Sequence, residues 1–211
     1  MIKYTHACVR LIDSDRDLLI DPGMWTEDAA FDGATDVLVT HEHEDHIDLE
    51  RLVAARDSNP VVRVFLPAPV AAQVTEKVPS FAPALQIVSA GDTFTASGFR
   101  VRAVGGEHAE IYDGLPGCAN IGYVVENSVY HPGDSVFVPD GAVETLLVPT
   151  SAPWLKLAEA IDFVRAVKPA RAFSIHDALA SDKGQVFNDR WLALKGETDY
   201  GRIKPGDGVD L

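Results

Sequence analysis

The sequence has 211 residues, 46% of them hydrophobic, and a formal net charge of −14 from 32 acidic and 18 basic side chains. No Gly/Ser-rich linker divides it, so we expect a single domain over residues 1–211 with a sizeable core. The negative charge disfavours nucleic acid and anionic membranes as partners, and no apolar stretch is long enough to span a bilayer. The first residues lack the pattern of a signal peptide, which favours a cytoplasmic protein. The sequence is compatible with a monomer and with a homo-oligomer, and a small molecule is the expected substrate.

The first third of the chain is predicted to form mainly strands. Apolar stretches separated by turns predict strands at residues 7–12, 18–20, 37–40 and 61–66. The first two form a hairpin whose second strand ends at Asp21, directly before the strand-breaking Pro22-Gly23. A helix is expected from Leu49 onwards, with Asp48 as its N-cap.

The rest of the chain is predicted to combine further strands with helices. We expect strands at residues 85–89, 92–95, 99–104, 121–125, 129–131, 146–148 and 172–175, and helices at residues 70–78, 154–167 and 183–194. Hairpin turns are expected at residues 96–98 and at Glu126-Asn127. Many strands followed by strand–helix units favour two stacked sheets covered by helices.

A histidine-rich run, Thr40-His41-Glu42-His43-Glu44-Asp45-His46, lies between a predicted strand and a predicted helix. Imidazole nitrogens and carboxylate oxygens are the usual ligands of zinc and similar divalent ions. Because side chains at i and i+2 of an extended segment point the same way, His41 and His43 can reach one ion. Asp45 and His46 lie where the chain turns into the helix and can reach a second ion. The run therefore predicts a two-metal site.

Two other interpretations of this run stay open at this point. The first is a solvated polar loop in which Asp45 or Asp48 only caps the following helix. The second is a purely structural metal site, although structural zinc usually prefers a closed set of four Cys or His ligands.

A two-metal site also needs ligands from elsewhere in the chain. His108, Asp134 and His176 each follow a predicted strand, and His6 and His131 lie near strand ends. Strand ends at one edge of a sheet converge in space, so these side chains can belong to one site. Each of them alone has an ordinary structural explanation, as a hydrogen-bonded histidine or a turn aspartate. The prediction depends on all of them together with the histidine-rich run.

The two cysteines, Cys8 and Cys118, show no CxxC spacing. We expect both to be small core residues, Cys8 within a strand, and neither to bind metal, because histidines and aspartates already supply the ligands. A single disulfide between them is the alternative.

The order of these motifs resembles that of the metallo-β-lactamase superfamily of hydrolases over essentially the whole chain. The match runs through Asp21, Thr40 to His46, His108, Asp134 and His176. The sequence looks most like the small ascorbate-6-phosphate-lactonase-like branch, through Thr5-His6-Ala7-Cys8, Leu19-Ile20-Asp21-Pro22, Tyr130-His131-Pro132-Gly133-Asp134 and His176-Asp177. The resemblance implies an α+β fold, a four-layer αββα sandwich.

The resemblance also implies a role for each site residue. His41, His43 and His108 would bind one metal ion, Asp45, His46 and His176 the other, and Asp134 would bridge both. Asp21 would orient the histidine-rich loop from behind, and His6 and His131 would line or support the site. Zinc is the default metal for such ligands, and manganese and iron accept the same set. A water held between two cations loses a proton near neutral pH, and Asp45 would orient it and carry a proton to the leaving group.

The expected function is hydrolysis of a small ester, lactone or phosphodiester, and sugar-phosphate lactones are a first trial on the branch resemblance alone. The alternative is a non-catalytic metal-binding or sensor protein of the same fold. The loops at residues 24–31, with Trp25, and 110–120, with Tyr112 and the Pro116-Gly117 turn, are expected to shape the substrate pocket.

Overall fold

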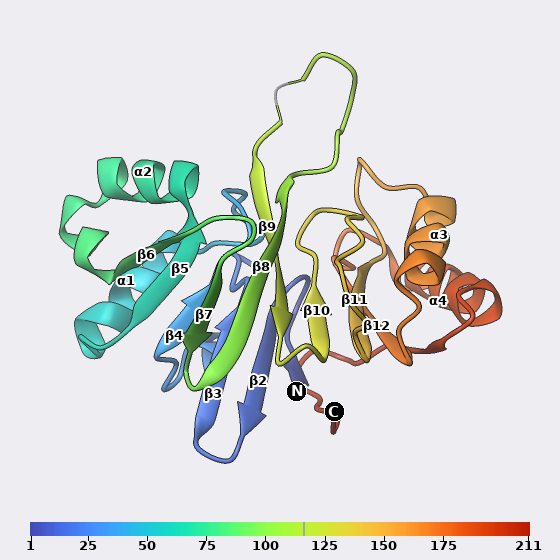
Figure 1. Cartoon of the computed structure of the whole chain (residues 1–211), viewed down its shortest axis with the longest axis horizontal. Coiled ribbons are helices and arrows are strands. Elements are labelled where there is room, and N and C mark those ends of the chain that lie inside the picture. Colours follow the sequence, from blue (N-terminus) through green and yellow to red (C-terminus); the bar gives the residue numbers. More distant parts are fainter. Residues whose placement is uncertain (116) are drawn as a thin grey trace.

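The computed structural model describes residues 1–115 and 117–211. Two β-sheets face each other, and helices cover their outer faces (Figure 1). The first sheet, in spatial order, consists of β1 (Ile2–Lys3), β2 (Val9–Asp13), β3 (Arg16–Ile20), β4 (Asp36–Leu38), β5 (Arg63–Pro67) and β6 (Leu85–Val88). The second, in spatial order, consists of β13 (Asp199–Gly201), β12 (Arg171–Ile175), β11 (Thr145–Pro149), β10 (Val129–His131), β9 (Ala119–Val125), β8 (Phe99–Glu107) and β7 (Thr93–Ala96).

Helices pack on each side of the paired sheets. They are α1 (Leu49–Ser58) and α2 (Ala68–Lys77) beside the first sheet, α3 (Leu157–Val167) and α4 (Asp182–Lys195) beside the second, and the 3₁₀ helices η1 (Asp28–Ala30) and η2 (Pro79–Ala84) (Figure 1). Asp48 caps α1 as expected, since its side chain accepts a hydrogen bond from the Arg51 backbone N–H. Within the described residues, none of the helices has the length and apolar character needed to cross a membrane.

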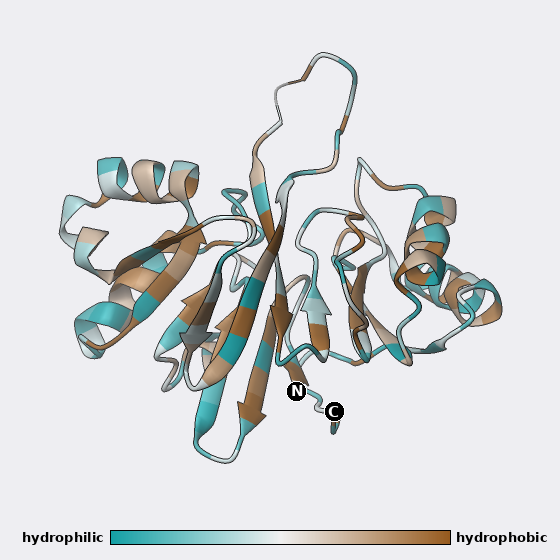
Figure 2. Ribbon diagram, viewed as in Figure 1, coloured by the Kyte–Doolittle hydropathy of each residue, from teal (hydrophilic) through white to brown (hydrophobic). Residues whose placement is uncertain are grey.

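Three hydrophobic layers hold the sandwich together. The central layer joins the two sheets and includes Leu18 and Tyr123. Leu19, the next residue of β3, points the opposite way and packs with Leu52 of α1 in the layer between the first sheet and its helices. A third layer packs Phe163 of α3 onto the second sheet. Apolar residues accordingly run along the strands (Figure 2), and the expected αββα sandwich is confirmed.

The predicted elements are found with some shifts at their ends. The hairpin turn at Glu126-Asn127 is present, and both residues have positive φ. The helix predicted from Trp154 begins at Leu157, so Trp154 lies in the preceding loop. Cys8 lies just before β2 and not within a strand, and both cysteines are free thiols. The short strands β1 and β13 were not predicted, because two or three residues carry no readable periodicity.

The strand directions bring the predicted site residues to one edge of the sandwich. Strands β3 and β4 are parallel, as are β10, β11 and β12, and β8 runs in the same direction as β10 because both are antiparallel to β9. Next to this edge the two sheets are linked directly. The Ile121 N–H donates to the Thr40 carbonyl at 2.9 Å, and the Tyr123 hydroxyl donates to the Val39 carbonyl at 2.8 Å.

Candidate metal centre

The histidine-rich loop is held in place by the turn that follows β3. The Met24 N–H donates to the Glu44 carbonyl at 2.8 Å, and the Asp48 N–H donates to the Pro22 carbonyl at 2.9 Å. Between them, Gly23 packs so closely that a Cβ there would lie 1.9 Å from the Asp45 carbonyl oxygen. Only glycine fits this position. Pro22-Gly23 therefore ends the strand β3 and also forms the surface against which the histidine-rich loop packs.

Asp21 lies behind the loop and is fully buried. Its Oδ1 accepts from the Thr40 N–H at 2.8 Å, and its Oδ2 accepts from the Thr40 hydroxyl at 2.7 Å. The same Oδ2 lies 2.7 Å from His46 Nδ1. The carboxylate therefore fixes the start of the loop and the ring of His46, in the orienting position that the sequence predicts.

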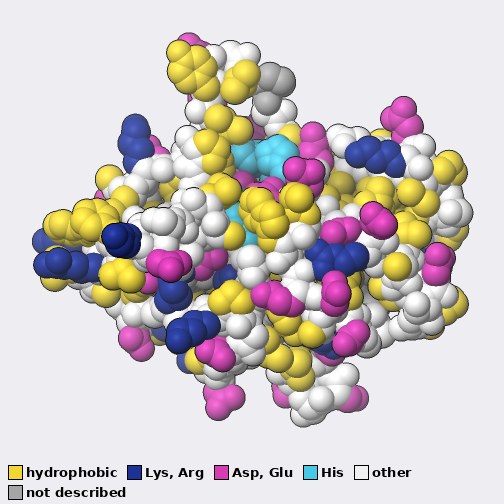
Figure 3. Space-filling view, turned by 180° about the vertical axis from the view of Figure 1, so that it is seen from behind, with side chains coloured by type: hydrophobic (Ala, Val, Ile, Leu, Met, Phe, Trp, Pro, Cys, Tyr) yellow, Lys and Arg dark blue, Asp and Glu magenta, His cyan; other side chains and the backbone are white. Residues whose placement is uncertain are grey.

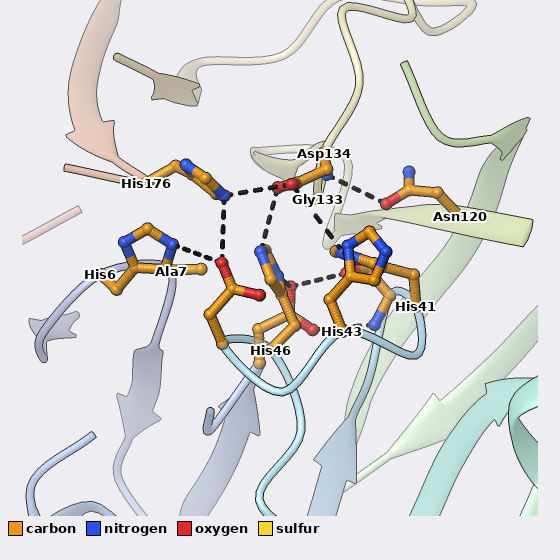
Figure 4. Close-up of polar contacts among 12 residues, drawn as sticks. His6, Ala7, His41, His43, His46, Asn120, Gly133, Asp134 and His176 are labelled. Atoms are coloured by element: carbon orange, nitrogen blue, oxygen red, sulfur yellow. Dashed lines mark hydrogen bonds and ion pairs between the residues drawn. The ribbon is translucent and has the colours of Figure 1, made fainter. Parts of the chain in front are cut away.

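The structure brings the predicted ligands together in two adjoining groups (Figure 4). The first group contains His41, His43, His108 and Asp134, and the second contains His6, Asp45, His46 and His176. Within each group the candidate ligand atoms all lie within 4.8 Å of one another. All seven residues predicted as ligands are included, from four different segments of the chain.

Asp134 lies between the two groups (Figure 4). Its Oδ2 is 3.3 Å from His108 Nε2 on one side and 3.1 Å from His176 Nε2 on the other. Its Oδ1 is 3.0 Å from His46 Nε2. A carboxylate with contacts on both sides is suited to bridge two cations.

Four buried atoms in this centre lack a hydrogen-bond partner in the described part of the chain, namely His46 Nε2, His108 Nε2, His176 Nε2 and Asp134 Oδ1. They lie close to one another but without hydrogen-bonding geometry. Leaving such atoms unsatisfied in the interior costs free energy, so their convergence calls for a ligand. Imidazole nitrogens and carboxylate oxygens are a donor set that fits divalent metal ions.

Three of the histidines, His41, His108 and His176, are held through Nδ1 so that Nε2 faces the centre. Nδ1 of His108 lies 2.6 Å from the Ala109 carbonyl, and Nδ1 of His176 lies 2.7 Å from the Ser151 carbonyl. Nδ1 of His41 lies 2.9 Å from the Thr40 hydroxyl. Donation from Nδ1–H to these oxygens leaves the lone pair on Nε2, which is the tautomer that a metal ligand needs.

The turn that presents Asp134 depends on two residues that the sequence analysis missed. The Asn120 side chain accepts from the Asp134 N–H at 3.0 Å and donates to the Pro132 carbonyl at 2.9 Å. The Trp154 indole N–H donates to Asp134 Oδ2 at 3.0 Å. Gly133 has φ +62°, and a Cβ there would meet Asn120 Oδ1 at 2.3 Å. A single Asn or Trp forms no recognisable motif in a sequence. The only local feature that indicated a turn here was the Pro132-Gly133 pair before Asp134.

His6, which was expected to line or support the site, lies within the second group. Its Nε2 is 3.0 Å from Asp45 Oδ2, and its Nδ1 accepts from the Ala178 N–H at 3.3 Å. Burial lowers the pKa of His6 to about 4, so the ring is neutral at pH 7 and carries its one proton on Nε2. In this state His6 donates to Asp45 and orients it. His131 lies behind the centre, with Nε2 2.8 Å from the Ala7 carbonyl and Nδ1 accepting from the Gly133 N–H at 3.1 Å, next to Asp134.

The charged groups of the centre shift one another's pKa values. Burial opposes protonation of His46, but Asp134 and Asp21 outweigh it and raise its pKa well above the usual value. Burial likewise opposes protonation of His176, yet its contacts with Asp134 and Asp45 raise its pKa to about 9. Burial favours the neutral form of Asp134, but the neighbouring histidines hold its pKa well below the usual range. The metal-free centre therefore keeps the carboxylate of Asp134 ionised and holds protons on His46 and His176.

A pocket of about 840 Å³ opens beside His43 and His108. The loop after β8 lines it, as predicted for residues 110–120, although Tyr112 is not among the lining residues and Pro116 lies outside the described residues. Cys118 also lines the pocket and is half-buried, so it is not the core residue that we expected. Burial raises its pKa to about 11, which leaves the thiol protonated. Seen from behind (Figure 3), histidine side chains are visible in a hollow bordered by acidic and hydrophobic side chains.

Comparison with known proteins gives consistent matches. Residues 1–176 match the family described as "Beta-lactamase superfamily domain". The chain is 38% identical to the Mycobacterium tuberculosis protein Rv0786c over 95% of this chain and 94% of that protein. It is 27% identical to the UPF0173 metal-dependent hydrolase Ta0764 of Thermoplasma acidophilum, over 93% of this chain and 90% of that one. Among solved structures, the metallo hydrolase Igni18 of Ignicoccus hospitalis superposes with a TM-score of 0.75 at 17% identity, covering 99% of this chain and 96% of that one.

Proposed function

The chain belongs to the metallo-β-lactamase superfamily of metal-dependent hydrolases, and we propose that it uses two divalent metal ions to hydrolyse a small ester, lactone or phosphodiester. The observation that carries this proposal is the arrangement around Asp134. Two groups of donor atoms share this one carboxylate, and four of the buried atoms have no hydrogen-bond partner in the described part of the chain. One tetrahedral ion does not need so many ligands.

In this proposal each group of residues holds one ion. His41, His43 and His108 hold the first, and Asp45, His46 and His176 hold the second, with Asp134 between them. Zinc suits this donor set, and manganese or iron is accepted by the same residues. When bound, the ions supply an acidified water and polarise the oxygen of the scissile group.

Asp45 is the group placed to handle protons during the reaction. Its Oδ2 accepts from His6 and lies 3.5 Å from His176 Nε2, and its side chain is 19% exposed, so it faces the centre and remains accessible to solvent. Burial favours its neutral form, but the nearby His176 and the hydrogen bond from His6 hold its pKa well below the usual range. An ionised carboxylate in this position can orient a water and pass its proton to the leaving group.

The size of the pocket supports a small substrate. A volume of about 840 Å³ beside His43 and His108 accommodates a drug-sized molecule and not a polymer. The net charge of −14 also disfavours nucleic acid.

A panel of lactones, phosphodiesters, thioesters and short RNA, assayed with zinc and with manganese, tests the proposal. We expect at least one small substrate to be hydrolysed, with activity lost to a chelator and restored by metal. Metal-loaded protein that hydrolyses none of the panel would favour the non-catalytic sensor alternative. Efficient cleavage of RNA with every small substrate left intact would overturn the assignment of a small substrate.

A further inference from the structure

The pocket beside the metal centre carries an uneven distribution of charge. The loop between β8 and β9 projects beyond both sheets (Figure 1) and forms one wall of the pocket. Acidic side chains line it at Glu42, Glu107 and Glu110, and apolar side chains at Ile111 and Leu115. Because His43 and His108 also line it, a molecule bound at the centre extends directly into this space.

Nothing in the described part of the chain neutralises these glutamates. No Lys or Arg is found among the described residues that line the pocket, and Glu107 and Glu110 have exposed side chains without an ion pair among the described residues. Glu42 accepts a hydrogen bond from Gln73, which leaves its charge in place. A group that enters the pocket therefore meets several negative charges and apolar surface together.

Building on the proposed function, we propose that this pocket holds an arm of the substrate that is apolar along its length and cationic at its end, and that it disfavours an arm that ends in an anionic group. The apolar part contacts Ile111 and Leu115, and the cationic end lies among the glutamates. At the centre itself, the carboxylates Asp21, Asp45 and Asp134 offset most of the charge of two divalent ions. The glutamates therefore make the electrostatic potential in the pocket negative where a substrate arm would lie.

This assignment changes the choice of trial substrates. Sugar-phosphate lactones, suggested by resemblance alone, would place a phosphate near Glu107 and Glu110 and are expected to be poor substrates. Esters and lactones that carry an ammonium group on a short alkyl chain are expected to be better.

Three hydroxamic acids with the same five-carbon chain test the inference without relying on turnover. They end in a trimethylammonium, a methyl or a carboxylate group, and the hydroxamate anchors each of them to zinc. Calorimetric titration of zinc-loaded protein should show the cationic probe binding at least about tenfold more tightly than the anionic one, with the neutral probe between them. The difference should shrink at high salt.

The variant Glu107→Gln/Glu110→Gln should reduce the ratio of the cationic to the anionic affinity to below about threefold, with little effect on the neutral probe. The matched control Glu50→Gln/Glu76→Gln removes two exposed acidic groups from α1 and α2, which do not line the pocket, and should keep the ratio.

Equal affinities for the three probes, no binding to zinc-loaded protein, or an unchanged ratio in the first variant would overturn the inference. The metal content, measured first, separates the two hypotheses. Protein that takes up neither zinc, manganese nor iron refutes the proposed function, and the inference with it, whereas metal-loaded protein without charge preference refutes the inference alone.

Discussion

Replacing Asp21 by asparagine tests how the carboxylate behind the histidine-rich loop supports metal binding. Asp21 Oδ2 accepts from the Thr40 hydroxyl and lies 2.7 Å from His46 Nδ1, and an amide NH₂ in its place would face two donors. Thr40 can rotate its hydroxyl, but His46 can accept from the amide only in the tautomer that carries its proton on Nε2. That atom faces Asp134 at 3.0 Å and is needed for the metal.

We expect Asp21→Asn to weaken zinc binding by about 10- to 100-fold, the usual cost of losing a partner that orients a ligand. The same change removes hydrogen bonds to a charged acceptor, so the free energy of unfolding of the metal-free protein should fall by about 2–3 kcal/mol. A competition titration with a chromophoric chelator measures the first effect, and denaturant unfolding measures the second.

Asp36→Asn is the matched control. Asp36 begins β4, the strand that leads to the histidine-rich loop, and it is also buried, with its carboxylate accepting from Arg63 at 2.6 and 2.8 Å. This variant should lose stability to a similar extent but keep the zinc affinity of the parent protein. Equal zinc affinities of the two variants would show that Asp21 is only a structural residue, and the reasoning about His46 would be refuted.

Three further predictions concern the centre itself. Asp45→Ala should lower turnover at least about 100-fold while fold and some metal are retained, and near-parental rates in a folded, metal-loaded variant would show that the proton-transfer role is wrong. Because the pKa of His46 is raised and that of His176 is raised to about 9, zinc must displace their protons. Binding at pH 7.5 should therefore release one to two protons, seen by calorimetry in buffers of different ionisation enthalpy, and zinc affinity should rise with pH up to about 9; no proton release would contradict this. Replacing both Cys8 and Cys118 by serine should leave the metal content unchanged, and loss of metal by elemental analysis would assign a cysteine ligand.

The sequence was sufficient to predict the layers of the fold. Paired apolar residues such as Leu18 and Leu19, which occupy different hydrophobic layers, mark a strand buried on both faces. The edge strands β1 and β13 were missed because so few residues give no pattern, and their formation depends on tertiary contacts such as the pairing of Ile2 with Arg10.

The site was predictable where a ligand type coincided with a strand end, as for His108 and His176. It was not predictable where a side chain acts across the fold. Trp154 was assigned to a helix, yet its indole N–H reaches Asp134, 20 residues earlier in the chain. His6, in the segment between β1 and β2, is separated from Asp45 by 39 residues, and only the tertiary fold brings the two side chains to 3.0 Å.

The two-metal assignment is tested most directly by anomalous scattering from crystals of the zinc-loaded protein at the zinc edge. We predict two peaks about 3.5–4 Å apart. One should lie among His41, His43 and His108, and the other beside His46 and His176, with Asp134 in contact with both. A single peak at full occupancy, or a peak outside these two groups of residues, would contradict the two-metal assignment.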